Sequence, residues 1–272
     1  MIASVAARCG PRLRRYARAF TYAGRDQIAY PFALLTRSLM LIVFVYVFNA
    51  LWRAIAGGDG QLRGLTVVQL TWYLVFTEMV ELARPSVMGE IQGQVQDGSI
   101  AYGLVRPYSY PLFALARAFG QAVTKTVPIG LAGAVVALAL VGPLPGLAAA
   151  LPRGLALLAG ALLLNCLWML VIGLTAFWFE SVMPFQWIHQ KLVFILGGML
   201  FPLDLLPPWL GSVAERLPFA FQAYWPARMI VDPAPERFGA ALLGTGLYAL
   251  ALGALAIALF RIGKRRVQAH GG

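Results

Sequence analysis

Long apolar runs alternate with short polar or proline-rich segments along almost the whole chain. A membrane-spanning helix needs about 20 predominantly apolar residues, and most of these runs meet that length. Their expected bounds are 34–56, 65–83, 112–141, 155–179, 192–206 and 238–260. The fifth run is short for a full crossing unless its helix begins near Phe185. The pattern therefore predicts an all-α membrane protein with six spans, and we expect residues 1–272 to form a single transmembrane domain.

Two further segments are expected to lie against the membrane rather than across it. In residues 11–26, Leu13, Tyr16 and Phe20 share one helical face and the arginines lie elsewhere, which predicts a basic amphipathic helix in the head-group plane. A solvated basic tail is the alternative. Residues 201–237, between the last two spans, are rich in proline and aromatic residues and predict short re-entrant helices folded onto the outer face of the bundle.

A polar segment, residues 84–111, interrupts the apolar runs between the second and third spans. Val87, Ile91 and Val95 recur in it at four-residue spacing, which predicts one or two short helices with a narrow apolar stripe. Pro107 and Pro111 close the segment. We expect a helical elbow at one membrane face, with its polar groups directed outward.

Composition and charge support a membrane protein and not a nucleic-acid-binding one. The 272 residues are 60% apolar and 12% charged, whereas soluble domains are about 45–50% apolar and about 25% charged. The net charge of +11 is concentrated in basic residues before the first span and after the last. Basic flanks mark cytoplasmic sides, so both termini and the elbow are expected in the cytoplasm, and no nucleic-acid partner is expected.

The sequence lacks the parts of common enzyme sites. It contains no G-x-x-x-x-G-K-[ST] phosphate-binding loop, no G-x-S-x-G elbow and no H-E-x-x-H pair. Cys9 precedes the first expected span and Cys166 lies within a later one, so these two cysteines are not expected to form a zinc site together with His189 and His270. We therefore assign no catalytic, cofactor-binding or metal-binding residue to this chain and do not expect it to be an enzyme.

Glu78, Glu81 and Lys125 are the ionisable residues expected to be buried within the predicted spans. Such residues are functional candidates because charges are costly in a membrane. An interfacial ion pair among them is the favoured interpretation. A proton relay is the alternative, and it would make the chain a proton-coupled secondary transporter or channel. Lys125 also repeats with Arg117 and Gln121 at four-residue intervals on one helical face.

The outer segment carries more aromatic residues than a plain loop needs. They are Trp209, Phe219, Phe221, Tyr224 and Trp225. An interfacial aromatic belt is the favoured interpretation, and a lid over an exit path is the alternative.

The order of these segments resembles the permeases of type-2 ATP-binding-cassette (ABC) exporters. The elbow reads E-I-x-x-x-x-x-D-G-S-I-x-Y-x-L-x-R-P from Glu90 to Pro107, and Glu90, Gly98, Leu104 and Pro107 stand where the family's coupling helix has its glutamate, glycine, leucine and proline. The sequence of this segment is most similar to that of the viologen-exporter-like subgroup. Prolines and aromatics after the fifth span also match the family.

The resemblance implies a permease subunit that pairs with an identical or related permease and with two separate ABC ATPase subunits, which carry ATP and Mg. It implies a multi-pass location in the bacterial cytoplasmic (inner) membrane, in contact with lipid. Coupling to the ATPase would use Glu90, Ile91, Gln94, Asp97, Gly98, Leu104, Arg106 and Pro107. The scarcity of charges in the spans favours a hydrophobic or amphiphilic cargo.

Overall fold

The computed structural model describes residues 10–56, 60–104 and 106–270, which are mostly helical. The first half contains α2 (Pro11–Ile28), α3 (Pro31–Ile55), β1 (Gln61–Leu62), β2 (Leu65–Thr66), α4 (Val67–Leu82), α5 (Val87–Gln96) and α6 (Ile100–Leu104). The second half contains α7 (Tyr110–Val141), α8 (Leu147–Leu174), η2 (Thr175–Phe177), α9 (Met183–Leu196), η3 (Leu203–Leu205), α10 (Pro208–Ala214), α11 (Tyr224–Val231) and α12 (Pro235–His270).

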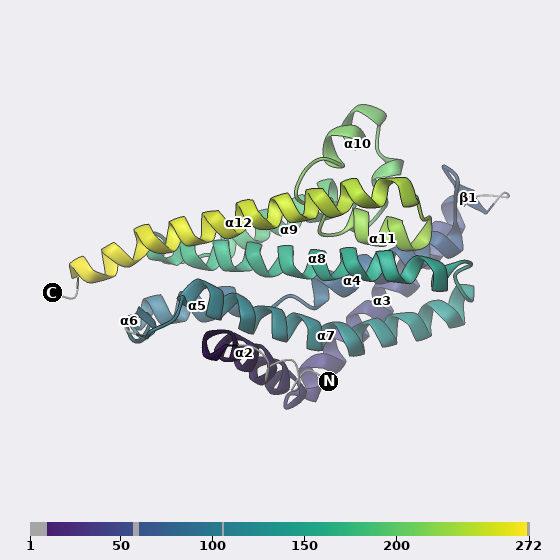
Figure 1. The fold of residues 1–272 in the computed structure, drawn as a ribbon. Coiled ribbons are helices and arrows are strands. Elements are labelled where there is room, and N and C mark those ends of the chain that lie inside the picture. Colours follow the sequence, from purple (N-terminus) through teal and green to yellow (C-terminus); the bar gives the residue numbers. More distant parts are fainter. Residues whose placement is uncertain (1–9, 57–59, 105, 271–272) are drawn as a thin grey trace.

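The long helices α7, α8 and α12 run lengthwise beside one another (Figure 1). Helix α8 is central, since 67% of its apolar window is buried inside the protein, against 11–22% for the other long helices. The elbow formed by α5 and α6 lies at the same end of the bundle as the C-terminus, and the β1–β2 ribbon lies at the opposite end (Figure 1). The two ends of the bundle are therefore built differently.

Four described helices are long and apolar enough to cross a membrane. They comprise Pro31–Ile55, Tyr110–Val141, Leu147–Phe177 and Pro235–Arg266. Their outer faces carry large apolar side chains such as Phe32 and Leu250, 81% and 73% exposed, which need lipid or another protein as neighbour. Helices α4 and α9 have only 16 and 14 residues and fall short of a full span. The structure is that of an α-helical membrane protein with four helices of spanning length, and α4 and α9 are shorter apolar helices beside them.

The helix expected over 192–206 has different bounds. Helix α9 runs from Met183 to Leu196, so it begins in the polar stretch before the expected run, close to Phe185. Gly197 and Gly198 follow the last residue of the helix, and Gly198 adopts a left-handed φ of 67° that favours glycine. The fourth predicted span also begins earlier than expected, at Leu147, because the alanines that follow are strong helix formers and Pro152 is accommodated within the helix.

A small β ribbon departs from the all-α expectation. Strands β1 and β2 are antiparallel, and Arg63 and Gly64 in the turn between them both have positive φ. Such φ values suit the tight hairpin turn whose twist matches the strands. Helix α4 follows directly and has a capping box, in which the Thr66 hydroxyl accepts from the Gln69 amide at 3.2 Å.

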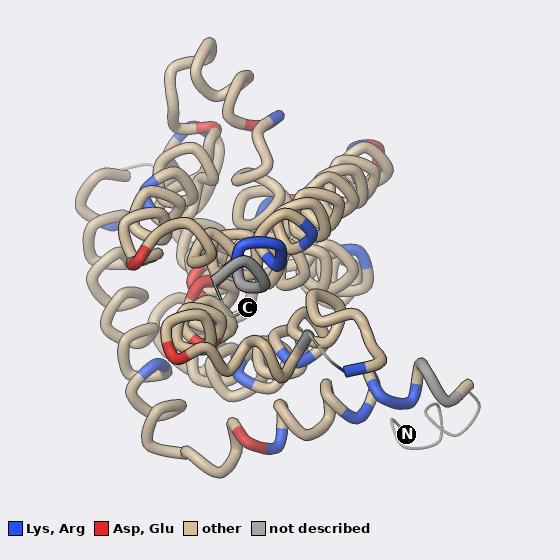
Figure 2. The backbone as a smooth tube through the Cα atoms, turned by 90° about the vertical axis from the view of Figure 1, so that its left-hand side faces the viewer, with Lys and Arg blue, Asp and Glu red and all other residues tan. Residues whose placement is uncertain are grey.

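Helix α2 packs closely on α7. A Cβ added to Gly120 of α7 would lie 2.2 Å from the backbone oxygen of Phe20, and one added to Gly24 would lie 2.6 Å from the Thr124 hydroxyl. Glycines at both positions allow the two backbones to approach. Figure 2 shows arginines spaced along α2, while its buried face contains small residues such as Ala23. The helix therefore has a basic exposed side and a small-residue packing side.

Candidate functional site

Helix α5 is anchored to the bundle by its apolar stripe. Val87, Met88 and Ile91 are buried, and a Cβ on Gly173 of α8 would lie 3.0 Å from the Met88 Cα and 3.2 Å from the Ile91 Cδ1. The resemblance to the permeases had implied that Ile91 contacts the ATPase. That expectation needs correction, because Ile91 is 1% exposed and faces α8.

Glu90 lies on the other side of α5 and is bound to α7. Its Oε2 is 3.3 Å from Nη1 of Arg117, and its Oε1 accepts hydrogen bonds from Gln121 Nε2 at 3.1 Å and from the Ser86 hydroxyl at 2.6 Å. Arg117 and Gln121 belong to the four-residue repeat recognised in the sequence. Glu90 is therefore a link between the elbow and a long helix rather than a free charge at the surface.

The glutamines of α5 tie the elbow to three other elements. Gln94 Oε1 accepts from the Tyr110 hydroxyl at 2.6 Å, and the Tyr110 ring stacks on Phe260 of α12 at 5.3 Å. Gln92 Oε1 accepts from the amide of Val182, and Gln96 donates to the carbonyl of Glu180, both just before α9. The elbow thus contacts α7, α12 and the approach to α9.

The turn between α5 and α6 is the tip of the elbow. Asp97 Oδ1 accepts from the Ser99 amide at 2.8 Å, and Gly98 has a φ of 74°. Hydrogen bonds from Ser99 lower the pKa of the exposed Asp97 carboxyl. Asp97 is therefore ionised near neutral pH and lies exposed at the tip.

The exposed surface beyond this turn is formed by α6 and the segment after it. Tyr102 is 75% exposed, and Arg106 and Pro107 are exposed too; Leu104 is the last residue of α6. Arg106 donates to the Tyr108 hydroxyl at 3.0 Å, and Arg15 of α2 donates to the Pro107 carbonyl at 3.3 Å. Tyr102 was not among the expected contact residues, although its position in the motif was the available signal.

The ionisable residues near the end of α4 do not pair as expected. Glu81 forms an ion pair with Arg84 and accepts from Gln190 Nε2 at 3.2 Å. Lys125 instead donates to the Arg84 carbonyl at 3.1 Å. Within the described part of the chain, the Oε1 atom of Glu78 is buried without a hydrogen-bond partner. The three residues lie in one region, yet the ion pair there is between Glu81 and Arg84.

Residues from several helices fix the connection from α4 to α5. Arg37 of α3 donates to the Leu82 carbonyl, and Gln121 accepts from the Ser86 amide at 3.0 Å. Together with Lys125 and Gln190, these side chains bind the connection from α3, α7 and α9. Arg37 and Gln190 were missed as site residues because no local pattern indicates such long-range contacts.

The five outer aromatics do not form one belt. Trp209 is 70% exposed, whereas Phe221 and Tyr224 are buried. Phe221 packs against α12, where a Cβ on Gly244 would lie 2.3 Å from its ring. Phe219 stacks on Trp168 of α8 at 5.7 Å. Trp225 lies partly buried at 5.2 Å from Tyr224. Phe219, Phe221, Tyr224 and Trp225 therefore pack the outer segment onto the bundle, whereas Trp209 is exposed, and the belt and the lid both stay predictions.

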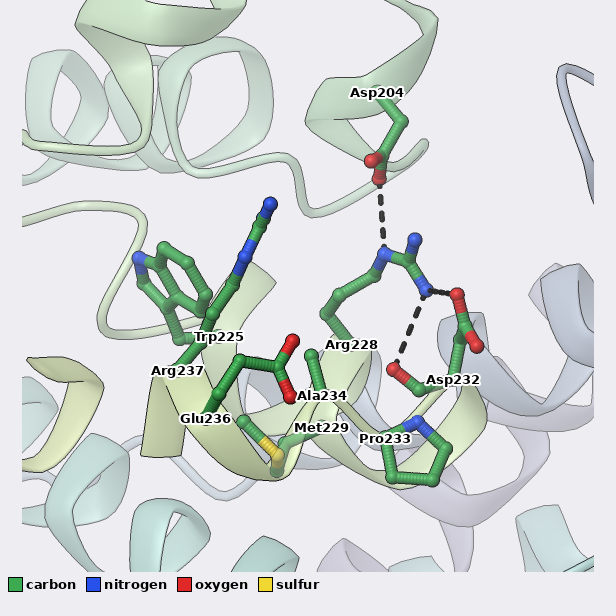
Figure 3. Close-up of a pocket in the computed structure, with 9 residues that line it drawn as sticks. All are labelled: Asp204, Trp225, Arg228, Met229, Asp232, Pro233, Ala234, Glu236 and Arg237. Carbon is green, nitrogen blue, oxygen red and sulfur yellow. Dashed lines mark hydrogen bonds and ion pairs between the residues drawn. The ribbon is translucent and has the colours of Figure 1, made fainter. Parts of the chain in front are cut away.

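A charged cavity of about 310 Å³ lies beside α11 (Figure 3). Arg228 stands between two carboxylates: its Nε is 3.2 Å from Asp204 Oδ2, and its Nη1 pairs with Asp232. Glu236 and Arg237 line the same cavity, as Figure 3 shows. Arg228 therefore links η3 to the end of α11 through two ion pairs.

The long apolar helices and the ordered elbow at one end define the class as a polytopic α-helical membrane protein. The model of the family described as ABC-2 family transporter protein matches residues 51–271, which is most of the chain. The protein therefore belongs to the ABC-2 family of transporters, and it is a transmembrane permease. A search of curated proteins gives no significant match.

Proposed function

We propose that this chain is the permease subunit of an ATP-driven exporter and that the elbow 84–111 couples it to separate ATPase subunits. The family match supports a permease that works with ABC ATPases, and supports this function over a proton-coupled transporter. Two ATPase subunits would bind and hydrolyse ATP with Mg, and the permease would pair with an identical or related permease. The amino-acid sequence of the elbow favours the viologen-exporter-like subgroup.

The observation that carries the coupling role is the division of the elbow into an anchored side and an exposed tip. The anchored side is held by the ion pair of Glu90 with Arg117 of α7 and by the hydrogen bond that Tyr110 donates to Gln94. The tip exposes Asp97, Tyr102 and Arg106. A partner that displaces such a tip moves the attached helices as rigid bodies. In this revised scheme Asp97, Gly98 and Tyr102 contact the ATPase, and Glu90 passes the movement to α7.

The proposed topology has six spans, namely α3, α4, α7, α8, α9 and α12, in the bacterial inner membrane. Helices α4 and α9 would complete their crossings with the segments that follow or precede them, and α10 and α11 would be re-entrant on the outer side. Both termini and the elbow would face the cytoplasm, as the basic residues along α2 and after Arg261 favour.

Co-purification with a co-expressed ABC ATPase tests the proposal. Tyr102→Ala combined with Asp97→Ala should reduce the ATPase recovered with the tagged permease, while membrane insertion stays normal. Trp209→Ala is the control, because Trp209 is equally exposed but lies in the outer segment. Normal ATPase recovery with the double variant would mean that the elbow tip is not the docking site.

A further inference from the structure

A cavity of about 630 Å³ opens between α3, α4, α8 and α9, beside the connection to the elbow. Residues 84–86 line it, so it lies toward the elbow end of the bundle. Its apolar lining includes Met40, Phe44 and Phe194, and its polar side chains are Glu78, Glu81, Arg37, Arg84, Lys191, Ser86 and two glutamines. Polar and apolar groups therefore meet in one cavity, which distinguishes it from an apolar groove between helices.

Glu78 is an acidic group of this cavity that the contacts within the protein do not explain. Its side chain lines the cavity, the residue is 2% exposed, and its Oε1 has no hydrogen-bond partner among the described residues. A buried carboxylate without a partner is costly, and native structures rarely leave one unsatisfied. A ligand that donates hydrogen bonds would remove this cost.

The cationic residues of the cavity are not all neutralised. Arg84 is paired with Glu81. Arg37 donates to a backbone carbonyl, and Lys191 lies 5.3 Å from the centre of the Phe194 ring; neither has a carboxylate partner within the described part of the chain. Two cations and the Glu78 carboxylate thus remain for a ligand. A head group with both an anion and a donating nitrogen complements this set.

The apolar lining identifies the rest of the ligand. Met40 on α3 is 51% exposed and Phe44 follows it by one helical turn, so the cavity continues onto an outer apolar face of α3. We infer that this cavity binds an amphiphile whose head group joins a phosphate-like anion to an ammonium, with the ammonium on Glu78 and the anion on Arg37 and Lys191. As a statement about cargo, this inference rests on the proposed export function.

Native mass spectrometry of the full-length permease in detergent tests this site without any ATPase. A negative result would therefore count against the binding site and not against the proposed coupling to ATP hydrolysis. The probes are dioleoyl phosphatidylethanolamine, which donates N–H bonds, and dioleoyl phosphatidylcholine, which cannot. We expect the ethanolamine lipid to bind about tenfold more tightly, since a charge-assisted hydrogen bond is lost in the choline lipid. Glu78→Gln should reduce this preference about tenfold, and Glu180→Gln, the same change at an exposed position, should keep it.

A second pair of variants tests the site without touching the buried carboxylate. Gly89 lines the cavity and Gly93 does not, and a Cβ at either position meets no atom within 4 Å. Gly89→Leu should therefore weaken binding of the ethanolamine lipid several-fold, and Gly93→Leu should leave it unchanged. Equal binding of the two lipids, or wild-type preference in Glu78→Gln, would overturn the inference. Equally tight binding of soluble phosphoethanolamine would overturn the part that assigns an amphiphile.

Discussion

Glu90 on α5 and Arg117 on α7 form an ion pair of 3.3 Å, and the same carboxylate accepts a hydrogen bond from Gln121 one turn further along α7. Two contacts on successive turns fix both the position and the direction of α5 relative to α7. The elbow is therefore attached firmly to α7, a helix of 32 residues. Under the proposed function, this junction passes movement of the ATPase to the membrane part.

Reversing the charges of the pair should separate their coupling from their individual roles. Glu90→Arg alone places two cations together and removes the acceptor of Gln121, a loss of about 1.5–3 kcal/mol. We expect transport to fall at least several-fold with near-normal membrane insertion, and partial recovery in the combination of Glu90→Arg with Arg117→Glu. Transport by the reconstituted complex is the measurement, and Glu180→Arg is the exposed control. Full transport by the single variant would show that the junction carries no movement.

Gly98 should resist substitution because of its backbone and not because of crowding. Its φ is 74°, and a Cβ there would meet no atom within 4 Å. A branched side chain costs about 1–2 kcal/mol in this conformation, whereas asparagine tolerates it better. Recovery of co-expressed ATPase should therefore decrease in the order wild type, Gly98→Asn, Gly98→Val. Gly93→Val is the control, and the same loss with Gly93→Val as with Gly98→Val would refute this explanation.

Arg228 should stabilise the outer segment. Arg228→Gln would leave Asp204 and Asp232 without their shared guanidinium, at a cost of about 1–3 kcal/mol. We expect the unfolding temperature in detergent, followed by tryptophan fluorescence, to fall by several degrees. Arg237→Gln provides the comparison, because Arg237 lines the same cavity without any ion pair to an acidic side chain in the described part of the chain. An equal decrease in both variants would contradict the bracing role.

The proposed orientation can be tested by cysteine labelling in intact cells. In a Cys9→Ser background, Asp97→Cys at the elbow tip should not react with a membrane-impermeant thiol reagent, and should react after the cells are opened. Gln61→Cys, exposed on β1 at the opposite end of the bundle, should react in intact cells. Labelling of Asp97→Cys in intact cells would mean that the elbow faces the outside and that the proposed orientation is wrong.

Much of the fold follows from the apolar runs, since a long apolar stretch has few alternatives to a spanning helix. The four-residue repeat of Arg117, Gln121 and Lys125 likewise indicated one face of α7, and all three side chains contact the elbow or its approach. Periodicity gives which residues share a face. It does not show which neighbour that face contacts, so Ile91, which the resemblance implied for coupling, lies buried against α8.

The remaining errors arise from long-range packing. Helix α9 begins in a polar stretch, and His189 there is buried because it meets Gln222 at 3.1 Å and Trp168 at 4.9 Å. Phe221 is buried because Gly244 leaves room for its ring. Neither partner lies near in sequence, so local patterns could not predict these contacts.

Site-specific photocrosslinking tests the central claim most directly, because it reports which permease residue touches the ATPase. A photoreactive phenylalanine analogue in place of Tyr102 should crosslink to the co-expressed ATPase, and the yield should change when ATP is added. The same analogue in place of Trp209, similarly exposed in the outer segment, should give no ATPase adduct. An adduct at position 209 and none at position 102 would contradict coupling through the elbow.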